Sequence, residues 1–252
     1  IVVGFFRRWG VGHRLTLLSG LSRFTGLSAS NGGSDCCFFI VVGFFRRCGI
    51  GRALLRGLSR FAGLGAGDGG VARELSRYET LKKIDVVEID EMVVSVCREY
   101  LPQTACGFND KRINLIYQDG LKYIRSCENE HDLIIVDSTD PFGPGEGLFT
   151  KEFYGNCYKA LRENGIMINQ HESPFYESDA IAMQRAHKRI VKSFPISRVY
   201  QAHIPTYPSG HWLFGFASKR CHPVGDLDEK RWNALGLNTK YYNTKLHAGA
   251  FA

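Results

Sequence analysis

From residue 65 onward, apolar runs of strand length alternate with stretches whose apolar residues recur at helical spacing. Such alternation is typical of a parallel sheet whose strands are joined by crossover helices. The predicted strands are 84–89, 113–117, 133–136 and 166–169, and the predicted helices are 71–78, 91–100, 121–126, 151–162 and 178–194. Two last strands, 196–202 and 211–217, form an expected antiparallel hairpin. We therefore expect a Rossmann-like α/β fold with a mostly parallel sheet, helices on both faces and a hairpin at its end.

Residues 1–64 do not share this pattern. The octapeptide Ile-Val-Val-Gly-Phe-Phe-Arg-Arg stands at 1–8 and again at 40–47. Two copies are too few for a solenoid, and glycines and arginines interrupt any helical stripe. We therefore divide the chain into an atypical Arg/Gly/Phe-rich duplicated segment of unknown fold at 1–64 and one domain at 65–252.

The net charge of +7 is concentrated in the first segment. Residues 1–64 hold nine arginines, no lysine and a single acid, so the rest of the chain has 23 basic and 24 acidic residues. A neutral main domain argues against nucleic acid or a membrane surface as a partner. The segment itself allows two interpretations: a basic amphipathic anchor, or, as we prefer, a stretch unrelated to the domain that arose from a cloning, assembly or frame error.

The cysteines and histidines give no sign of a metal centre. The eight cysteines include no C-x-x-C pair, and no histidine lies at zinc-finger spacing. No apolar run approaches the ~20 residues that a membrane span requires, and no secretory signal pattern is present. We therefore expect a cytoplasmic protein without a metal site.

A glycine-rich loop, Gly65-Ala-Gly-Asp-Gly-Gly70, directly precedes a predicted helix. Glycine lets the backbone turn tightly and approach a ligand without hindrance from a Cβ atom. Glu88 follows 18 residues later at the end of the next strand, where an acid can accept hydrogen bonds from both ribose hydroxyls. Together these features indicate an adenosine-containing ligand, although the strand before Gly65 is poor because charge and glycine interrupt residues 55–63.

Further acids follow the next two strands. Gln118-Asp119-Gly120 is positioned so that an acid meets the exocyclic amine of adenine. Asp137 and Asp140 then lie three residues apart on the loop that leaves a buried strand, at the carboxyl edge where open α/β sheets bind ligands. Two carboxylates at this place favour a cationic partner.

In this order, the glycine loop, Val87-Glu-Ile-Asp90, Asp119-Gly120, Asp137 to Pro144 and Ile204 to Gly210 resemble the signature series of the spermidine synthases, which are polyamine aminopropyltransferases. The resemblance covers residues 65–252. It implies the fold of S-adenosylmethionine-dependent methyltransferases. It also implies transfer of an aminopropyl group from decarboxylated S-adenosylmethionine, a co-substrate rather than a cofactor, to putrescine, which yields spermidine and methylthioadenosine.

The resemblance also implies a role for each site residue. Asp137 would be the general base that takes a proton from the attacking amine, because an aliphatic amine with a pKa near 10 is mostly protonated at neutral pH. Asp140 would bind putrescine, and Asp68 would contact the aminopropyl amine of the donor. Gln170 and Tyr207 would line the diamine channel, with Ser138 and Thr139 completing its wall. The nucleoside-binding residues would be Gly65, Gly67, Glu88, Ile89, Asp119, Gly120 and Pro144.

Several alternatives stay open. Asp68 is also a common turn or capping residue, and Tyr207 between prolines is often only a rigid hairpin tip. His171, followed by Glu172, has the composition of an acid/base pair, but we prefer a structural or solvent-facing role. His203 and His211 are expected to be wall residues rather than metal ligands.

The front of the chain departs from the family pattern. The resemblance implies an amino-terminal β-rich domain that supplies a glutamine and an aromatic or histidine side chain, and a homodimer or homotetramer if that domain is intact. Residues 1–64 contain neither glutamine nor tyrosine. A catalytically impaired family member therefore remains an alternative, as does an amine methyltransferase. Asp68 argues against the methyltransferase, whose donor carries a carboxylate.

Overall fold

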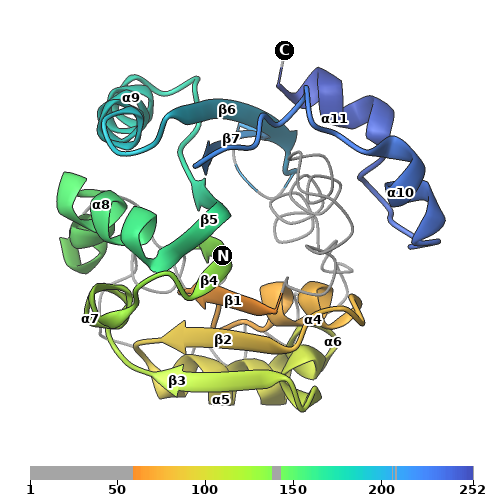
Figure 1. The fold of residues 1–252 in the computed structure, drawn as a ribbon. Helices are drawn as coiled ribbons and strands as arrows, with labels where there is room; N and C mark the ends of the chain where they lie inside the picture. Colours follow the sequence, from red (N-terminus) through yellow and green to blue (C-terminus); the bar gives the residue numbers. More distant parts are fainter. Residues whose placement is uncertain (1–58, 138–142, 206, 208, 252) are drawn as a thin grey trace.

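The computed structural model describes residues 59–137, 143–205, 207 and 209–251. These residues form one sheet of seven strands in the order β3-β2-β1-β4-β5-β7-β6 (Figure 1). The strands are β1 (Arg60–Leu64), β2 (Lys83–Glu88), β3 (Ile113–Tyr117), β4 (His131–Val136), β5 (Leu161–Gln170), β6 (Ile196–His203) and β7 (His211–Ser218). The first five are parallel, and β7 is antiparallel to β5 and to β6. The expected mostly parallel sheet with a terminal hairpin is confirmed.

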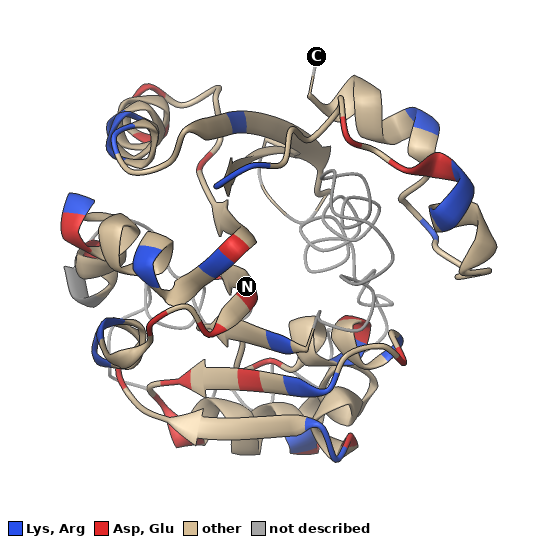
Figure 2. Ribbon diagram, in the orientation of Figure 1, with Lys and Arg blue, Asp and Glu red and all other residues tan. Residues whose placement is uncertain are grey.

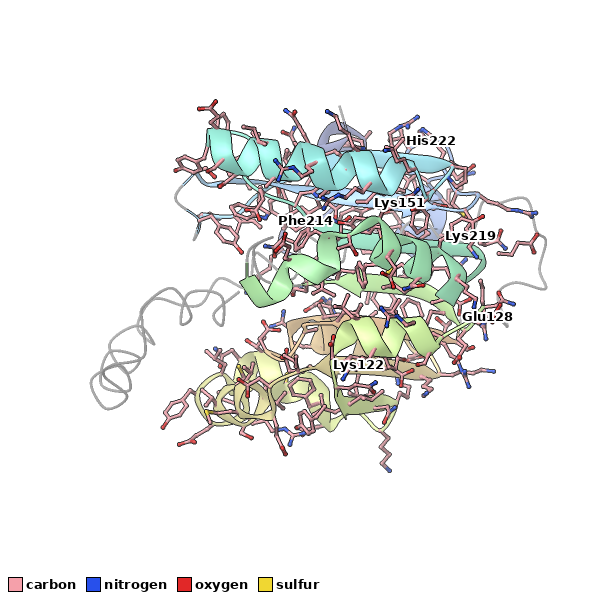
Figure 3. All side chains as sticks on the ribbon, turned by 90° about the vertical axis from the view of Figure 1, so that its left-hand side faces the viewer. Lys122, Glu128, Lys151, Phe214, Lys219 and His222 are labelled. Carbon is pink, nitrogen blue, oxygen red and sulfur yellow. The ribbon has the colours of Figure 1, made fainter. Side chains whose placement is uncertain are left out.

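Helices cover both faces of the sheet, as expected. The helices are α4 (Gly70–Ser76), α5 (Glu91–Tyr100), α6 (Pro102–Ala105), α7 (Gly120–Ser126), α8 (Lys151–Ala160), α9 (Glu177–Val191), α10 (Glu229–Ala234) and α11 (Thr244–Ala250), with short 3₁₀ helices η2 (Cys106–Asn109) and η3 (Gly143–Phe149). Helices α7, α8 and α9 lie in a row across one face (Figure 3). Helices α4, α5, α10 and α11 pack on the other face, so that an apolar cluster fills each side of the sheet.

Side-chain caps set where several helices begin. Asp90 accepts a hydrogen bond from the backbone N–H of Met92 at the start of α5. Thr150 caps α8 in the same way through the N–H of Phe153. Such caps satisfy backbone donors that the first helical turn leaves without partners, and each typically contributes about 1 kcal/mol.

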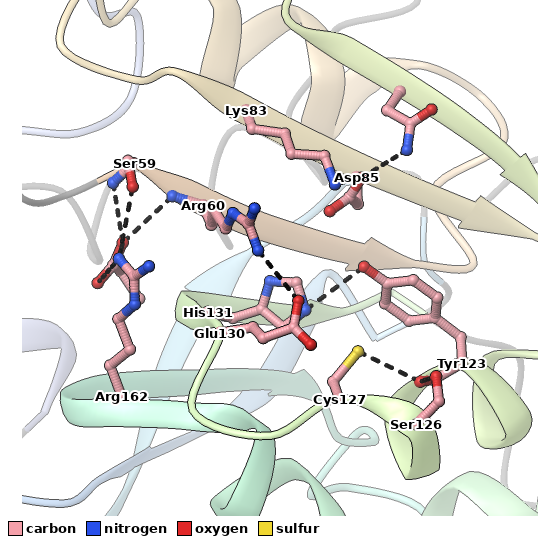
Figure 4. A network of polar contacts seen from close by, with 12 residues as sticks. Ser59, Arg60, Lys83, Asp85, Tyr123, Ser126, Cys127, Glu130, His131 and Arg162 are labelled. Carbon is pink, nitrogen blue, oxygen red and sulfur yellow. Dashed lines mark hydrogen bonds and ion pairs between the residues drawn. The ribbon is translucent and has the colours of Figure 1, made fainter.

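The strand ahead of Gly65 forms as β1 between β2 and β4, so the expectation of a poor strand was wrong. The backbone N–H groups of Ser59 and Arg60 both donate to one oxygen of Asp132, and Arg162 pairs with the same carboxylate (Figure 4). Arg60 also pairs with Glu130 at 3.1 Å. Pairing with β2 and β4 on both sides, with the four residues after Arg60 buried, outweighs the weak local propensity. The rest of the 1–64 segment, up to residue 58, lies outside the described residues.

One predicted boundary and two unpredicted helices show where tertiary structure departs from the sequence expectation. The predicted helix 151–162 ends at Ala160, and β5 begins at the next residue because Leu161 pairs with His131 of β4. The chain beyond β7 carries α10 and α11, for which no element was predicted. Helices of six and seven residues are too short to show a clear periodic pattern, and here tertiary packing supports them, as in the edge-on contact of Trp232 with Tyr242 at 4.6 Å.

Candidate active site

The carboxyl ends of the five parallel strands lie level along one edge of the sheet. The strand register places Leu64 of β1 beside Val87 of β2 and Val136 of β4. Backbone hydrogen bonds of 2.9 Å then continue one residue past the strands, from Gly65 N to the Val87 oxygen and from Asp137 N to the Leu64 oxygen. The loops that hold the predicted site residues are therefore fixed against one another before any side chain is considered.

Glu88 and the glycine loop fit together at this edge. The Glu88 side chain is 8% exposed, and its Oε1 accepts a hydrogen bond of 3.1 Å from the N–H of Asp90. Its other oxygen, Oε2, lies 2.6 Å from where a Cβ atom at position 67 would be, so a larger residue there would displace the Glu88 side chain. Gly65 itself has a positive φ of 76°, which glycine adopts without strain. The loop thus leaves Glu88 in place at the end of β2, and contact of its carboxylate with a ribose stays a prediction.

Asp68 has a structural contact of its own. One carboxylate oxygen, Oδ1, accepts a hydrogen bond of 3.0 Å from the N–H of Gly70. The neighbouring Gly69 has a φ of 85°, and a Cβ atom there would meet the backbone of Ala105 at 2.7 Å. The turn-residue interpretation of Asp68 therefore holds, and contact of its carboxylate with a donor amine stays a prediction.

Asp119 lies in the loop after β3, and the exposed Ile89 follows the neighbouring strand β2. Asp119 accepts a hydrogen bond of 2.8 Å from the N–H of Leu121 and so caps α7. Gly120 is close to Leu64 and Leu148, at 3.8 and 3.9 Å from its notional Cβ position. Ile89, directly after β2, is 66% exposed. Contact of these residues with an adenine ring remains a prediction.

Asp137 directly follows β4 at the middle of this edge. Desolvation, together with smaller contributions from the negative charges of Asp68 and Glu88, raises the pKa of the Asp137 carboxyl to about 6. A carboxylate with this pKa is a better proton acceptor than an ordinary aspartate while still being ionised at neutral pH. The structure thus brings together three of the predicted acids, Asp68, Glu88 and Asp137, closely enough for their charges to interact.

The β5–β7–β6 part of the sheet forms the other half of the edge. Gln170 ends β5 opposite Phe214 of β7. Because β7 runs antiparallel to β5, the hairpin between β6 and β7 comes to the same edge as the carboxyl end of β5. Tyr207 in this hairpin stacks on Trp212 with a ring separation of 4.0 Å and an angle of 15°. Sequence reasoning missed Trp212, although an aromatic residue just after a hairpin turn was a signal for such a stack.

The histidines singled out in the sequence occupy different environments. His203 and His211 face each other across β6 and β7 with ring centroids 5.3 Å apart. His171 is 1% exposed, so its role is structural rather than solvent-facing. Within the part of the chain that the structure describes, no group of three or more potential metal ligands is found.

Four predicted residues cannot be placed in full. Ser138, Thr139 and Asp140 lie outside the described residues, and of Pro144 only the backbone is described, within η3.

Among the described helices none is both long and apolar enough to cross a membrane.

Residues 58–228 match the family model described as the spermine/spermidine synthase domain. The chain belongs to this family. The aminopropyltransferase resemblance inferred from the motifs is thereby confirmed, and the match begins ahead of Gly65, at the residues that lead into β1.

Curated relatives and solved structures agree with this assignment. The chain is 71% identical to a polyamine aminopropyltransferase from Clostridium beijerinckii and 70% identical to one from Alkaliphilus oremlandii, each over 183 residues, 73% of this chain. It spans 64% of the length of these relatives. A crystal structure of spermidine synthase in complex with the transition-state analogue AdoDATO is similar with a TM-score of 0.75 and 35% identity, over 88% of this chain and 71% of that one. The crystal structure of spermidine synthase from Thermotoga maritima is similar with a TM-score of 0.76 and 36% identity, over 88% of this chain and 72% of that one. This spermine/spermidine synthase family member therefore has the fold of solved spermidine synthases.

Proposed function

We propose that this protein transfers the aminopropyl group of decarboxylated S-adenosylmethionine to putrescine and releases spermidine and methylthioadenosine. The observation that carries the proposal is the position of Asp137, whose half-buried carboxyl with a pKa of about 6 lies at the carboxyl edge of the sheet within range of the Asp68 and Glu88 charges. Membership of the aminopropyltransferase family and likeness to a structure that holds AdoDATO support it.

The proposed reaction is a single displacement at carbon. The lone pair of the putrescine nitrogen attacks the methylene group next to the sulfonium, a new C–N bond forms, and the C–S bond breaks. The bonding electrons go to sulfur, so methylthioadenosine leaves as a neutral molecule. The new secondary ammonium carries an extra proton, and Asp137 takes one proton from the amine as it reacts.

The remaining site residues divide between the two substrates. We propose that Glu88 binds the ribose hydroxyls, with Asp119, Gly120 and Ile89 beside the adenine. On the acceptor side, Gln170, Tyr207 and the undescribed Asp140 would receive the diamine. The donor and the acceptor are both cationic, which suits an edge that carries several carboxylates.

The charge at Asp68 distinguishes this reaction from methyl transfer. S-adenosylmethionine carries a carboxylate that the decarboxylated donor lacks, and a carboxylate next to Asp68 would be repelled. Thermal-shift measurements with each donor test this: we expect the decarboxylated donor to stabilise the protein more at equal concentration. A larger shift with S-adenosylmethionine would favour an amine methyltransferase instead.

The decisive assay combines purified protein, decarboxylated donor and a panel of putrescine, agmatine, cadaverine and spermidine, with mass detection of the products. We expect spermidine from putrescine as the fastest product. The Asp137→Asn variant is the matched control, because it keeps the shape of the side chain and removes proton acceptance. Loss of a general base typically costs ~10²- to 10⁴-fold in rate. A variant that keeps more than about a third of the wild-type rate would remove Asp137 from the role of base.

A further inference from the structure

Gly215 of β7 contributes no side chain to the layer between the sheet and α9, and side chains of β5 fill the space instead. Gly215 lies directly opposite Asn169 of β5 and Val199 of β6. A Cβ atom at position 215 would lie 2.8 Å from Nε2 of His171 and closer still to Oδ1 of Asn169. Two polar side-chain ends from β5 therefore occupy the space that any larger residue at position 215 would need.

The Asn169 amide joins this pair to the backbone of the strand end. Its Nδ2 donates to the carbonyl oxygen of Gln170 at 3.0 Å and lies 3.2 Å from Nδ1 of His171. A carbonyl oxygen can only accept, so the group that faces it must be the NH₂ and not the oxygen of the amide. The NH₂ then donates its other hydrogen to Nδ1 of His171, and the imidazole proton is on Nε2.

The imidazole of His171 is held neutral. The side chains of Asn169 and His171 are 2% and 1% exposed. Burial and, to a smaller extent, the nearby His187, whose ring lies edge-on at 5.6 Å, together lower the pKa of His171 to about 3. The ring is thus a poor base at neutral pH, and the acid/base interpretation of His171 with Glu172 loses its support. Its Nε2 and the Asn169 Oδ1 have no hydrogen-bond partner among the described residues.

The peptide group between Gln170 and His171 is held at both polar atoms. Its carbonyl oxygen accepts from Asn169, and its N–H donates to the carbonyl oxygen of Leu213 in β7 at 3.0 Å. Successive side chains of a strand point to opposite faces, so Gln170 points away from Asn169 and His171, toward the face where Tyr207 and Trp212 pack. The orientation of this peptide plane determines the direction of the Gln170 side chain.

We propose that Asn169, His171 and Gly215 form a lock that positions Gln170 in the acceptor half of the active site. The lock rests on the proposed function, since it assigns a purpose to Gln170 as a wall of the diamine channel. None of its three members touches the reacting atoms, and they act on the acceptor amine only through Gln170. Loss of the lock should therefore weaken binding of the diamine and leave binding of the donor unchanged.

Two substitutions of His171 separate the lock from a general packing role. In His171→Asn, the amide oxygen takes the place of Nδ1 and keeps an acceptor for Asn169. In His171→Gln, the polar group lies near the former Nε2, and the acceptor at the Nδ1 position is lost. We expect the Gln variant to raise KM for putrescine about 10-fold, with kcat and KM for the donor within about twofold of wild type, and the Asn variant to restore most of the putrescine affinity.

Nuclear magnetic resonance gives readouts that do not depend on turnover. Long-range ¹H–¹⁵N spectra should show His171 with its proton on Nε2, and the Gln170 side-chain amide signal should broaden or shift in the Gln variant more than in the Asn variant. A proton on Nδ1, equal effects of the two variants, or equal rises of both KM values would overturn the lock. If the wild-type protein transfers no aminopropyl group, the proposed function fails, and the His171 and Gln170 signals still decide whether the lock exists.

Discussion

At the scale of single residues, the raised pKa of Asp137 connects catalysis with stability. A carboxyl whose pKa is higher in the folded than in the unfolded protein binds its proton more tightly when folded. Near pH 7.5 the group is ionised in both states, and the buried charge then costs free energy. Below about pH 4 it is protonated in both states, and the cost disappears. A rise from the ordinary value to about 6 corresponds to about 3 kcal/mol at most.

Asp137→Asn should therefore stabilise the protein while it removes most of the turnover. We expect a higher Tm at pH 7.5, with a gain that shrinks as the pH falls through 6 and is absent near pH 4. Differential scanning fluorimetry at several pH values measures this. Glu128→Gln is the control, because Glu128 is an exposed ion-pair residue for which we expect no such dependence (Figure 3). A lower Tm for the Asn variant at pH 7.5 would contradict the statement that the ionised Asp137 carboxylate destabilises the folded protein.

Glu88→Gln should act on the nucleoside. Glutamine keeps the shape that fits beside Gly67 but lacks the charge, and hydrogen bonds to a charged group contribute about 1.5–3 kcal/mol. Methylthioadenosine affinity should fall about 10- to 100-fold, whereas putrescine affinity should change little. Isothermal titration calorimetry with each ligand tests both statements. Unchanged methylthioadenosine affinity would place Glu88 outside the nucleoside site.

The sequence was informative about site residues that end strands and less so about what surrounds them. The positions of Glu88 and Asp137 at the carboxyl edge could be predicted because strand periodicity and loop position together determine which edge an acid reaches. The approach of Asn169 and His171 to Gly215 could not be predicted. It depends on the strand register that places Gly215, 46 residues further along the chain, opposite Asn169. Register between distant strands leaves no local pattern in the chain.

At the scale of elements, β1 shows how tertiary contacts override local propensity. Glycine and a charged residue interrupt its sequence, yet it lies between β2 and β4. The single carboxylate of Asp132 receives two backbone N–H groups where the strand begins and an arginine from β5. Sequence patterns describe a strand's own residues and are blind to an acceptor supplied by another strand.

Asp132→Ala should therefore destabilise the protein strongly. The substitution leaves two backbone donors and Arg162 without their acceptor, and removing one partner of a mostly buried charged group costs about 3–5 kcal/mol. The matched control is Glu130→Ala, two residues earlier, whose ion pair with Arg60 is 41% exposed on both sides and is worth under ~1 kcal/mol. Urea denaturation compares the two. Equal losses would show that Asp132 does not fix the start of β1.

At the scale of the whole molecule, the described residues from 59 onward contain the complete sheet and both apolar clusters. The acid at the arrowhead of β2 and the acids in the following loops give the site edge a negative character, although residues 65–252 are almost neutral (Figure 2). Acidic and basic residues also lie on the other helices and strands, so the near-neutral total reflects a balance over the domain while this edge is locally negative.

A shortened chain of residues 58–252 should consequently fold on its own. We expect cooperative thermal unfolding, a far-ultraviolet circular dichroism spectrum typical of an α/β protein, and methylthioadenosine affinity within about threefold of the full chain, since a rigid sheet carries the nucleoside residues. The full chain measured side by side is the control. Loss of cooperative unfolding would mean that residues before 58 contribute to the core.

The strand order also has a consequence for the order of assembly during synthesis. The first four strands can pair as soon as the ribosome has released β4, because β1 to β4 pair only with one another up to that point. The acceptor half needs the hairpin, and within it β5 pairs with β7 and not with β6. β6 therefore emerges before β7, the strand that attaches it to the sheet. The backbone edge of β6 stays unpaired until about fifteen further residues, through the end of β7, have been translated.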